Sequence, residues 1–161
     1  MNRVTGSKGV KLLECVNPKY DKWRVRWDVK PEADSDTAVN YMEEEFNHKP
    51  TQEEVKRLLT DWHNEQTDEK ILSGFKWQGV PVWLSSENQF NYKTAYDLAV
   101  QTEGATLPVR FKFGTDDDPV FWEFYELGEL KEFYLASVRH VQDALQEGWT
   151  QKQKLKLTDY E

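Results

Sequence analysis

The chain has one cysteine, Cys15, and three histidines, His48, His63 and His140. A single cysteine excludes an internal disulfide framework and any CxxC metal or redox motif. The histidines form no HExxH motif, and no two of them have the spacing of helical metal ligands. Cys15 and a histidine could still meet in space as a catalytic dyad, but we interpret Cys15 as a packed strand residue.

Long apolar runs are also missing. No stretch approaches the roughly 18 apolar residues of a membrane-spanning helix. The opening residues, MNRVTGSKGVKLLECV, contain no run long enough for a signal peptide. We therefore expect a protein that stays in the cytoplasm of a bacterial cell, without export by a signal peptide and without a membrane partner.

Basic residues are fewer than acidic residues. Lysine and arginine total 21 against 29 acidic residues, which gives a formal net charge of -8 and a pI near 5.0. The basic residues are scattered, so the chain lacks the basic stripe of a nucleic-acid-binding surface, and we expect no nucleic-acid partner. Most acids fall in predicted helices and turns, and we interpret them as solvated surface rather than as a DNA mimic.

Catalytic motifs are absent as well. There is no phosphate-binding glycine-rich loop, no G-x-S-x-G and no Rossmann fingerprint. Asp116, Asp117 and Asp118 precede Pro119, and clustered carboxylates suit hard cations, but the alternation of an EF-hand is missing. We interpret the three acids as turn formers and leave a cation site as the alternative. We expect a protein that is not an enzyme, with no catalytic residue, no metal and no cofactor.

Aromatic residues are what the sequence has in abundance, with seven Trp, seven Tyr and eight Phe in 161 residues. Each ring can bury about 150–250 Å². A hydrophobic core can therefore form from few side chains, although the mean hydropathy is -0.84. The length fits one domain or one domain with an extra arm.

The first 47 residues are predicted to be rich in strands. Residues 10–16 indicate a strand, and KWRVRWDV (22–29) alternates strictly. Its apolar side chains share one face, which is typical of a half-buried strand. They are Trp23, Val25, Trp27 and Val29. Residues 37–47 suit a strand or a helix equally well. We treat 1–47 as a β-rich segment beside a hairpin–helix domain over 48–155, and whether both share one core is left open.

A helix is predicted from Thr51 to about Gln66, or on to Leu72. Thr51 and Glu54 have the spacing of a capping box. The helix carries an apolar stripe at helical spacing, made of Val55, Leu58, Leu59 and Trp62. Gly74 is predicted to end it.

The stretch GFKWQGVPVWLSS (74–86) predicts a β-hairpin with Gln78-Gly79 as its two-residue turn. In this register one face is apolar and points to the core, with Phe75, Trp77, Val80, Val82 and Leu84. Lys76, Pro81 and Trp83 point the other way. A helix then starts at a cap on Ser85 or Ser86 and ends at Gly104, with a core face of Phe90, Ala95, Leu98 and Ala99, and with Tyr92 and Tyr96 at its margin.

A second hairpin is predicted over residues 109–124, with GTDDDP as its turn and a long helix from about Gly128 to about Lys152 after it. One face of this hairpin is apolar, with Val109, Phe111, Phe113, Val120, Trp122 and Phe124. Each of the two hairpins is followed by a helix that ends in Glu-Gly, at 103–104 and 147–148. An internal duplication, in which two hairpins form one sheet covered by two helices, is one interpretation, and chance recurrence of a short pattern is the other, which we favour. The polar last residues, QKQKLKLTDYE, are expected to fray.

Aromatic and cationic residues coincide on the faces not assigned to the core. Trp83 accompanies Lys76, and Phe121 and Tyr125 accompany Arg110 and Lys112. Exposed, these six residues could stack on sugar rings or receive a peptide. We expect instead that a helix or the N-terminal strands cover most of this face. Trp83 is the residue most worth testing as a binding residue.

The run HKPTQEEVKRLLTDWHNEQTDEKILSGFKWQGVPVWLSSENQFNYKTAYDLA resembles small proteins of unknown function encoded among phage and prophage tail genes, notably in Bacteroides-type genomes. The resemblance covers residues 48–150 and brings no catalytic motif with it. It implies a structural or assembly part of a phage particle, or an accessory to one.

Together these observations predict an α+β fold in which antiparallel hairpins alternate with helices. The expected function is that of a non-enzymatic structural or interaction protein, linked to phage tails, with a protein partner or self-association. The alternative is a carbohydrate- or peptide-binding module that uses an aromatic surface.

Overall fold

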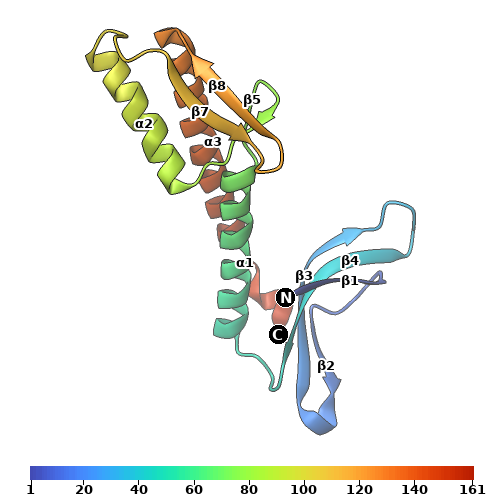
Figure 1. Cartoon of the computed structure of the whole chain (residues 1–161). Coiled ribbons are helices and arrows are strands. Elements are labelled where there is room, and N and C mark those ends of the chain that lie inside the picture. The colour runs from blue at the N-terminus through green and yellow to red at the C-terminus, as the bar shows by residue number, and fades with distance from the viewer. The chain divides into compact units, whose positions relative to one another are not determined.

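The computed structural model describes all 161 residues and has an α+β fold, as the sequence predicted (Figure 1). In chain order the elements are β1 (Asn2–Ser7), β2 (Leu13–Asn17), η1 (Pro18–Tyr20), β3 (Lys22–Pro31), β4 (Ala38–Phe46), α1 (Gln52–Ser73), β5 (Lys76–Trp77), β6 (Val80–Pro81), α2 (Ser86–Gln101), β7 (Val109–Gly114), β8 (Pro119–Phe124), α3 (Leu127–Gln153) and η2 (Leu157–Tyr160). None of the helices combines the length and apolarity needed to cross a lipid bilayer.

The chain divides into two compact units. Met1–Trp62 and Lys152–Glu161 form the N-terminal unit, and His63–Gln151 form the hairpin unit. The division falls within α1 rather than at residue 47, because Val55 and Leu59 at the start of α1 belong to the core of the N-terminal unit.

The N-terminal unit contains a four-stranded antiparallel sheet in the order β1-β4-β3-β2. The ambiguous stretch 37–47 is therefore mainly strand. Strand β1 was not predicted, since it is mostly polar and pairs only with β4.

One face of this sheet packs against α1. Val25 and Trp27 of β3 are buried against Val55 and Leu59, as the alternation in KWRVRWDV predicted. Val29 was predicted to share this face but is exposed. The pairing register shifts between Trp27 and Lys30, and Asp28 takes a φ of 51° there, so this bulge breaks the alternation.

The predicted capping box at the start of α1 is confirmed. The Glu54 N–H donates to Thr51 Oγ1 at 3.3 Å, and the Thr51 N–H donates to Glu54 Oε2 at 2.8 Å. The hydrogen bond from the Thr51 backbone is the main cause that lowers the pKa of Glu54 to about 2, and bonds from the Thr51 hydroxyl and His48 add to it.

The C-terminal residues do not fray as expected. Leu155 and Leu157 pack against the core of the N-terminal unit, and Tyr160 is buried in it. The Tyr160 hydroxyl donates to the Arg26 carbonyl at 3.1 Å, and burial raises the pKa of this tyrosine to about 12.

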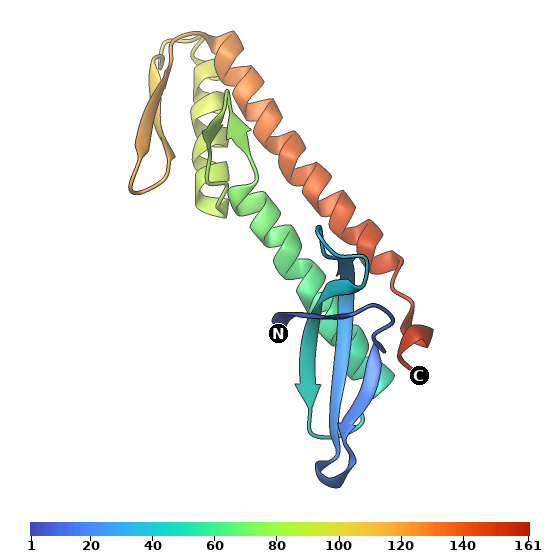
Figure 2. The same cartoon turned by 90° about the vertical axis from the view of Figure 1, so that its right-hand side faces the viewer.

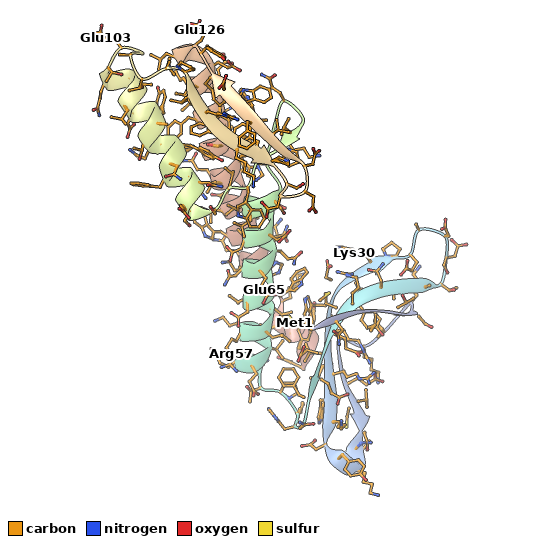
Figure 3. The ribbon with its side chains drawn as sticks, in the orientation of Figure 1. Met1, Lys30, Arg57, Glu65, Glu103 and Glu126 are labelled. Carbon is orange, nitrogen blue, oxygen red and sulfur yellow. The ribbon has the colours of Figure 1, made fainter.

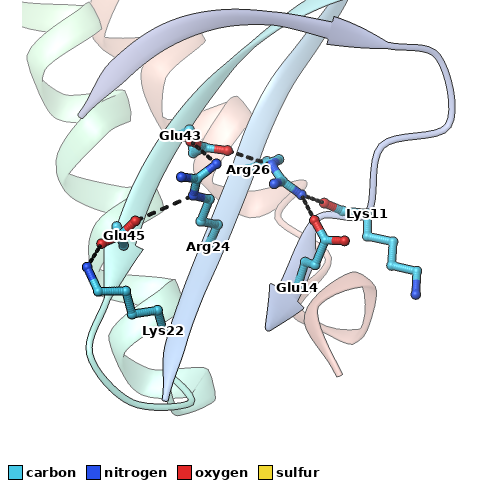
Figure 4. A network of polar contacts seen from close by, with 7 residues as sticks. All are labelled: Lys11, Glu14, Lys22, Arg24, Arg26, Glu43 and Glu45. Carbon is cyan, nitrogen blue, oxygen red and sulfur yellow. Dashed lines mark hydrogen bonds and ion pairs between the residues drawn. The ribbon is translucent and has the colours of Figure 1, made fainter. Parts of the chain in front are cut away.

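The other face of the sheet carries a network of ion pairs (Figure 4). Arg26 is only 4% exposed, and its Nε and Nη1 lie 2.7 Å from carboxylate oxygens of Glu43 and Glu14. Its Nη1 also donates to the Lys11 carbonyl at 2.9 Å. Arg24 and Glu45 extend the network at the surface. A buried guanidinium needs such partners, because an unpaired charge is costly to remove from water.

The hairpin unit contains two separate two-stranded sheets, β5-β6 and β7-β8, and not the single sheet expected from a duplication. In the first hairpin Trp77 pairs with Val80, as predicted. Gln78 and Gly79 have φ values of 46° and 84°, which is the left-handed backbone of a type I′ turn. Phe75, Val82 and Leu84 are buried, and Lys76, Pro81 and Trp83 are exposed, which confirms the predicted faces.

Figures 1 and 2 show the β7-β8 hairpin on one side of this unit and α3 on the other, with α2 and the β5-β6 hairpin at the flanks. The core between them is largely aromatic. Phe133 of α3 lies at its centre, with ring centroids 5.2 Å from Phe113 and 5.1 Å from Phe124. Tyr92 joins this cluster at 5.0 Å from Phe133.

The core face of α2 differs from the predicted one. Ala99 is buried as expected, but Phe90 is 67% exposed and Leu98 is also exposed, whereas Tyr92 is buried and Tyr96 packs on the core. The N-cap of α2 is Ser85, whose hydroxyl accepts from the Asn88 N–H at 3.2 Å. Figure 3 places Glu103, after α2, and Glu126, before α3, at the same end of this unit.

The two Glu-Gly pairs have different roles. Gly104 follows α2 with a φ of 89°, whereas Gly148 lies inside α3. A Cβ atom at Gly148 would lie 2.3 Å from Thr67 Oγ1 of α1. Gly148 therefore permits close helix contact and does not end a helix, so the similarity between the two segments is limited to sequence.

Candidate functional site

The β7-β8 hairpin turns one face inward and one outward. Its inward residues are the predicted ones, Val109, Phe111, Phe113, Val120, Trp122 and Phe124. The outward side chains are exposed and belong to Arg110, Lys112, Phe121, Glu123 and Tyr125. We call these five residues the outer hairpin face. It contains four of the six predicted binding residues.

A helix was one of the elements expected to cover this face, but within the hairpin unit no element covers it. Phe121 is 55% exposed and Tyr125 is 61% exposed. The physical reason is that α2 and α3 supply the apolar contacts on the inward side of the hairpin, while the N-terminal strands β2–β4 close a separate core with α1. No helix remains to pack on the outer hairpin face.

The cations of the outer hairpin face have different partners. The Arg110 guanidinium lies over the Phe121 ring, 4.4 Å from its centroid, in a cation–π contact. Lys112 Nζ lies 2.8 Å from Asp116 Oδ1. Tyr125 donates to Glu123, and this hydrogen bond raises the pKa of Tyr125. Arg110 is left without a carboxylate, so its charge is available to a binding partner.

Beside this hairpin lies a groove of about 590 Å³, which we call the Trp83 groove. It is lined by the end of α1, the segment after β6, the first turn of α2, and β7 with its turn. The lining residues are Leu72, Ser73, Pro81, Val82, Trp83, Asn88, Lys112, Phe113, Gly114, Thr115 and Asp116. Its volume lies within the ~300–1,000 Å³ typical of small-molecule sites.

The backbone around Trp83 is held from both sides. The Val82 N–H donates to the Phe75 carbonyl at 2.9 Å, and the Leu84 N–H donates to the Leu72 carbonyl at 3.1 Å. The Asn88 side chain donates to the Trp83 carbonyl at 2.8 Å. The indole, 51% exposed, therefore projects from a fixed backbone.

Five of the six predicted residues lie in two places that share Lys112. Trp83 and Lys112 line the groove, and Lys112 also belongs to the outer hairpin face with Arg110, Phe121 and Tyr125. Lys76 is exposed opposite Pro81 and lines neither. Sequence reasoning missed Asn88, whose only signal was its position after the Ser85 cap, and weighed Asp116 only as a turn or cation residue.

Two of the three histidines have hydrogen-bond partners outside the groove and the outer hairpin face. His48 Nε2 lies 3.0 Å from Glu54 Oε1, and His140 Nε2 lies 2.8 Å from the Lys70 carbonyl. Cys15 is half-buried on β2, opposite Trp23. No group of three or more His, Cys, Asp or Glu side chains is arranged to hold a metal ion. In the turn after β7, the Asp118 N–H donates to Thr115 Oγ1 at 3.0 Å.

Neither a protein-family model, nor a curated protein, nor a solved structure matches this chain.

Proposed function

We propose that this chain is a non-enzymatic interaction protein that binds a partner protein through the outer hairpin face. The observation that carries the proposal is the exposure of Phe121 and Tyr125 on this face, beside an arginine that has no carboxylate partner. Exposed aromatic side chains grouped with such a cation are a typical composition of a protein-binding surface.

The residue types support a protein as the partner. Tyrosine and arginine are among the residues that most often carry the binding energy of protein interfaces. Phe121 and Arg110 already pack on each other, so part of the entropy of ordering these side chains is lost before binding. A carboxylate on the partner would form an ion pair with Arg110.

The resemblance of residues 48–150 to phage and prophage tail-associated proteins suggests which partner to try first. We propose that it is a neighbouring component of such a particle or a second copy of this chain. In this role the chain is an assembly part and catalyses no reaction.

The test is co-purification of the tagged full chain with the products of adjacent genes, together with sedimentation of the chain alone. A variant with Arg110→Glu, Phe121→Ser and Tyr125→Ser should weaken partner binding at least about tenfold. Phe90→Ser removes an equally exposed aromatic from α2 and is the matched control, expected to bind normally. A strictly monomeric chain that retains no neighbour, or full binding by the triple variant, would refute the proposal.

A further inference from the structure

The Trp83 groove differs in chemistry from the outer hairpin face. It combines a half-exposed indole on a hydrogen-bonded backbone, a buried apolar floor and a rim of hydrogen-bonding side chains without net charge. We infer that it is a binding site for a short neutral saccharide. This activity is separate from the protein-binding function proposed above.

The apolar part of the groove suits one face of a sugar ring. Val82 and Phe113 are almost fully buried beneath it, and Trp83 is half exposed at its side. A pyranose presents several C–H groups on one face, and an aromatic ring offers a flat apolar surface of matching width. Stacking removes both surfaces from water.

The position of Trp83 is set before any ligand arrives. Its neighbours Val82 and Leu84 hydrogen-bond to Phe75 and Leu72, and its own carbonyl accepts from Asn88. A platform that is already ordered loses little conformational entropy on binding. This matters for saccharides, because each hydroxyl must give up water in order to bind.

The polar part of the groove offers both donors and acceptors. Lys112 can donate, the Asp116 carboxylate can accept from two hydroxyls, and Asn88 uses its Nδ2 on Trp83 and keeps Oδ1 as an acceptor. Ser73 and Thr115 add hydroxyls. Saccharide hydroxyls both donate and accept, so they match this mixed set.

Charge selects a neutral ligand over an anionic one. Lys112 and Asp116 are the only charged residues that line the groove, and they pair with each other at 2.8 Å. The hydrogen bond from Lys112 lowers the pKa of Asp116, so the carboxylate stays ionised near neutral pH. A phosphate or sulfate would meet this carboxylate without a free cation to offset it.

The experiment uses the full chain with maltotriose, cellotriose, mannotriose and triacetylchitotriose, followed by tryptophan fluorescence and calorimetry. At least one of these should bind at up to millimolar concentration, and Trp83→Ala should weaken that binding at least about tenfold. Trp149→Ala is the matched control, because Trp149 is also 51% exposed but does not line the groove. It should leave the affinity unchanged. Far-UV circular dichroism checks that both variants fold, and Asp116→Ala provides a second groove variant, also expected to bind more weakly.

Several results would overturn the inference. They are no binding of any of the four saccharides at millimolar concentration, binding that survives Trp83→Ala, or preference for a sulfated saccharide or a peptide over the neutral saccharides. The outer-face triple variant separates the two proposals. It should lose the partner protein but keep the saccharide, so either proposal can fail alone.

Discussion

The sheet of the N-terminal unit carries Arg24 and Arg26 on the face opposite α1, and the β7-β8 hairpin carries Arg110 on its outer face, but these arginines have different partners. On the N-terminal sheet Arg26 is buried between Glu43 and Glu14, and Arg24 has carboxylates from Glu43 and Glu45. On the hairpin, Arg110 lies on an aromatic ring and has no carboxylate.

The difference separates a polar surface that stabilises the fold from the surface that we propose binds a partner. In the N-terminal network the charges satisfy one another, so a partner would gain little from contacting them. On the outer hairpin face Phe121 and Tyr125 stay exposed, and Arg110 has no carboxylate partner. Charged residues on a strand therefore do not identify a site by themselves, and their partners within the chain have to be known.

The largest change in stability is expected at Arg26. Arg26→Met should lower the free energy of unfolding by about 2–3 kcal/mol, because Glu43 loses a counter-charge in a largely buried place and the Lys11 carbonyl loses its donor. Arg24→Met is the matched control on the same strand. Its partners lie 3.4 and 3.5 Å away and the side chain is partly exposed, so it should cost no more than about 1 kcal/mol. Urea unfolding measures both, and equal losses would contradict the distinction.

A second test compares the two cores through one buried tyrosine each. Burial raises the pKa of Tyr92 and of Tyr160 to about 12, against 10.0 as the ordinary value. The unfolded chain therefore ionises first, so stability is full below pH 10 and falls as the pH rises toward 12. The loss should be about 2–3 kcal/mol for each tyrosine.

Phenylalanine variants should distinguish the two cores. Tyr92→Phe and Tyr160→Phe should each flatten the alkaline part of the stability profile. At pH 7 only Tyr160→Phe should be destabilising, by about 1 kcal/mol, because its hydroxyl donates to the Arg26 carbonyl. Urea unfolding at pH 7 and pH 11 measures the effect, and a Tyr92→Phe profile as steep as that of the wild type would contradict it.

The smallest effect is expected on the outer hairpin face itself. Phe121→Ser should change the free energy of unfolding by no more than about 0.5 kcal/mol, since the ring is more than half exposed and lies against the Arg110 guanidinium. Thermal unfolding of the variant beside the wild type measures this. A loss above about 1 kcal/mol would mean that the face stabilises the fold rather than serving a partner.

The sequence was informative wherever the cause of a feature is local. The capping box at Thr51 and Glu54 and the turn at Gln78-Gly79 depend on residues a few positions apart, and both were predicted correctly. The exposure of Trp83 followed from the register of that hairpin. The alternation in β3 located Val25 and Trp27 in a core.

Features with distant causes were missed. Arg26 alternates like a surface residue, and its burial depends on Glu14, Glu43 and the Lys11 carbonyl. The core face of α2 was misassigned because Phe90 is more apolar than Tyr92, whereas only Tyr92 lies opposite Phe133. The Trp83 groove brings Leu72, Asn88 and Asp116 together, and no spacing in the sequence relates them.

The burial of Tyr160 has a consequence for how the protein is made. The N-terminal unit is discontinuous in sequence, because Lys152–Glu161 return to a core that β3 begins. The hairpin unit is one uninterrupted stretch, which leaves the ribosome earlier than those last residues. Domains generally fold as units during synthesis. The hairpin unit can therefore finish folding before the N-terminal unit, although its synthesis begins later. Until those last residues emerge, Val25 and Trp27 can pack against Val55 and Leu59, but the part of their core that Tyr160 supplies is missing.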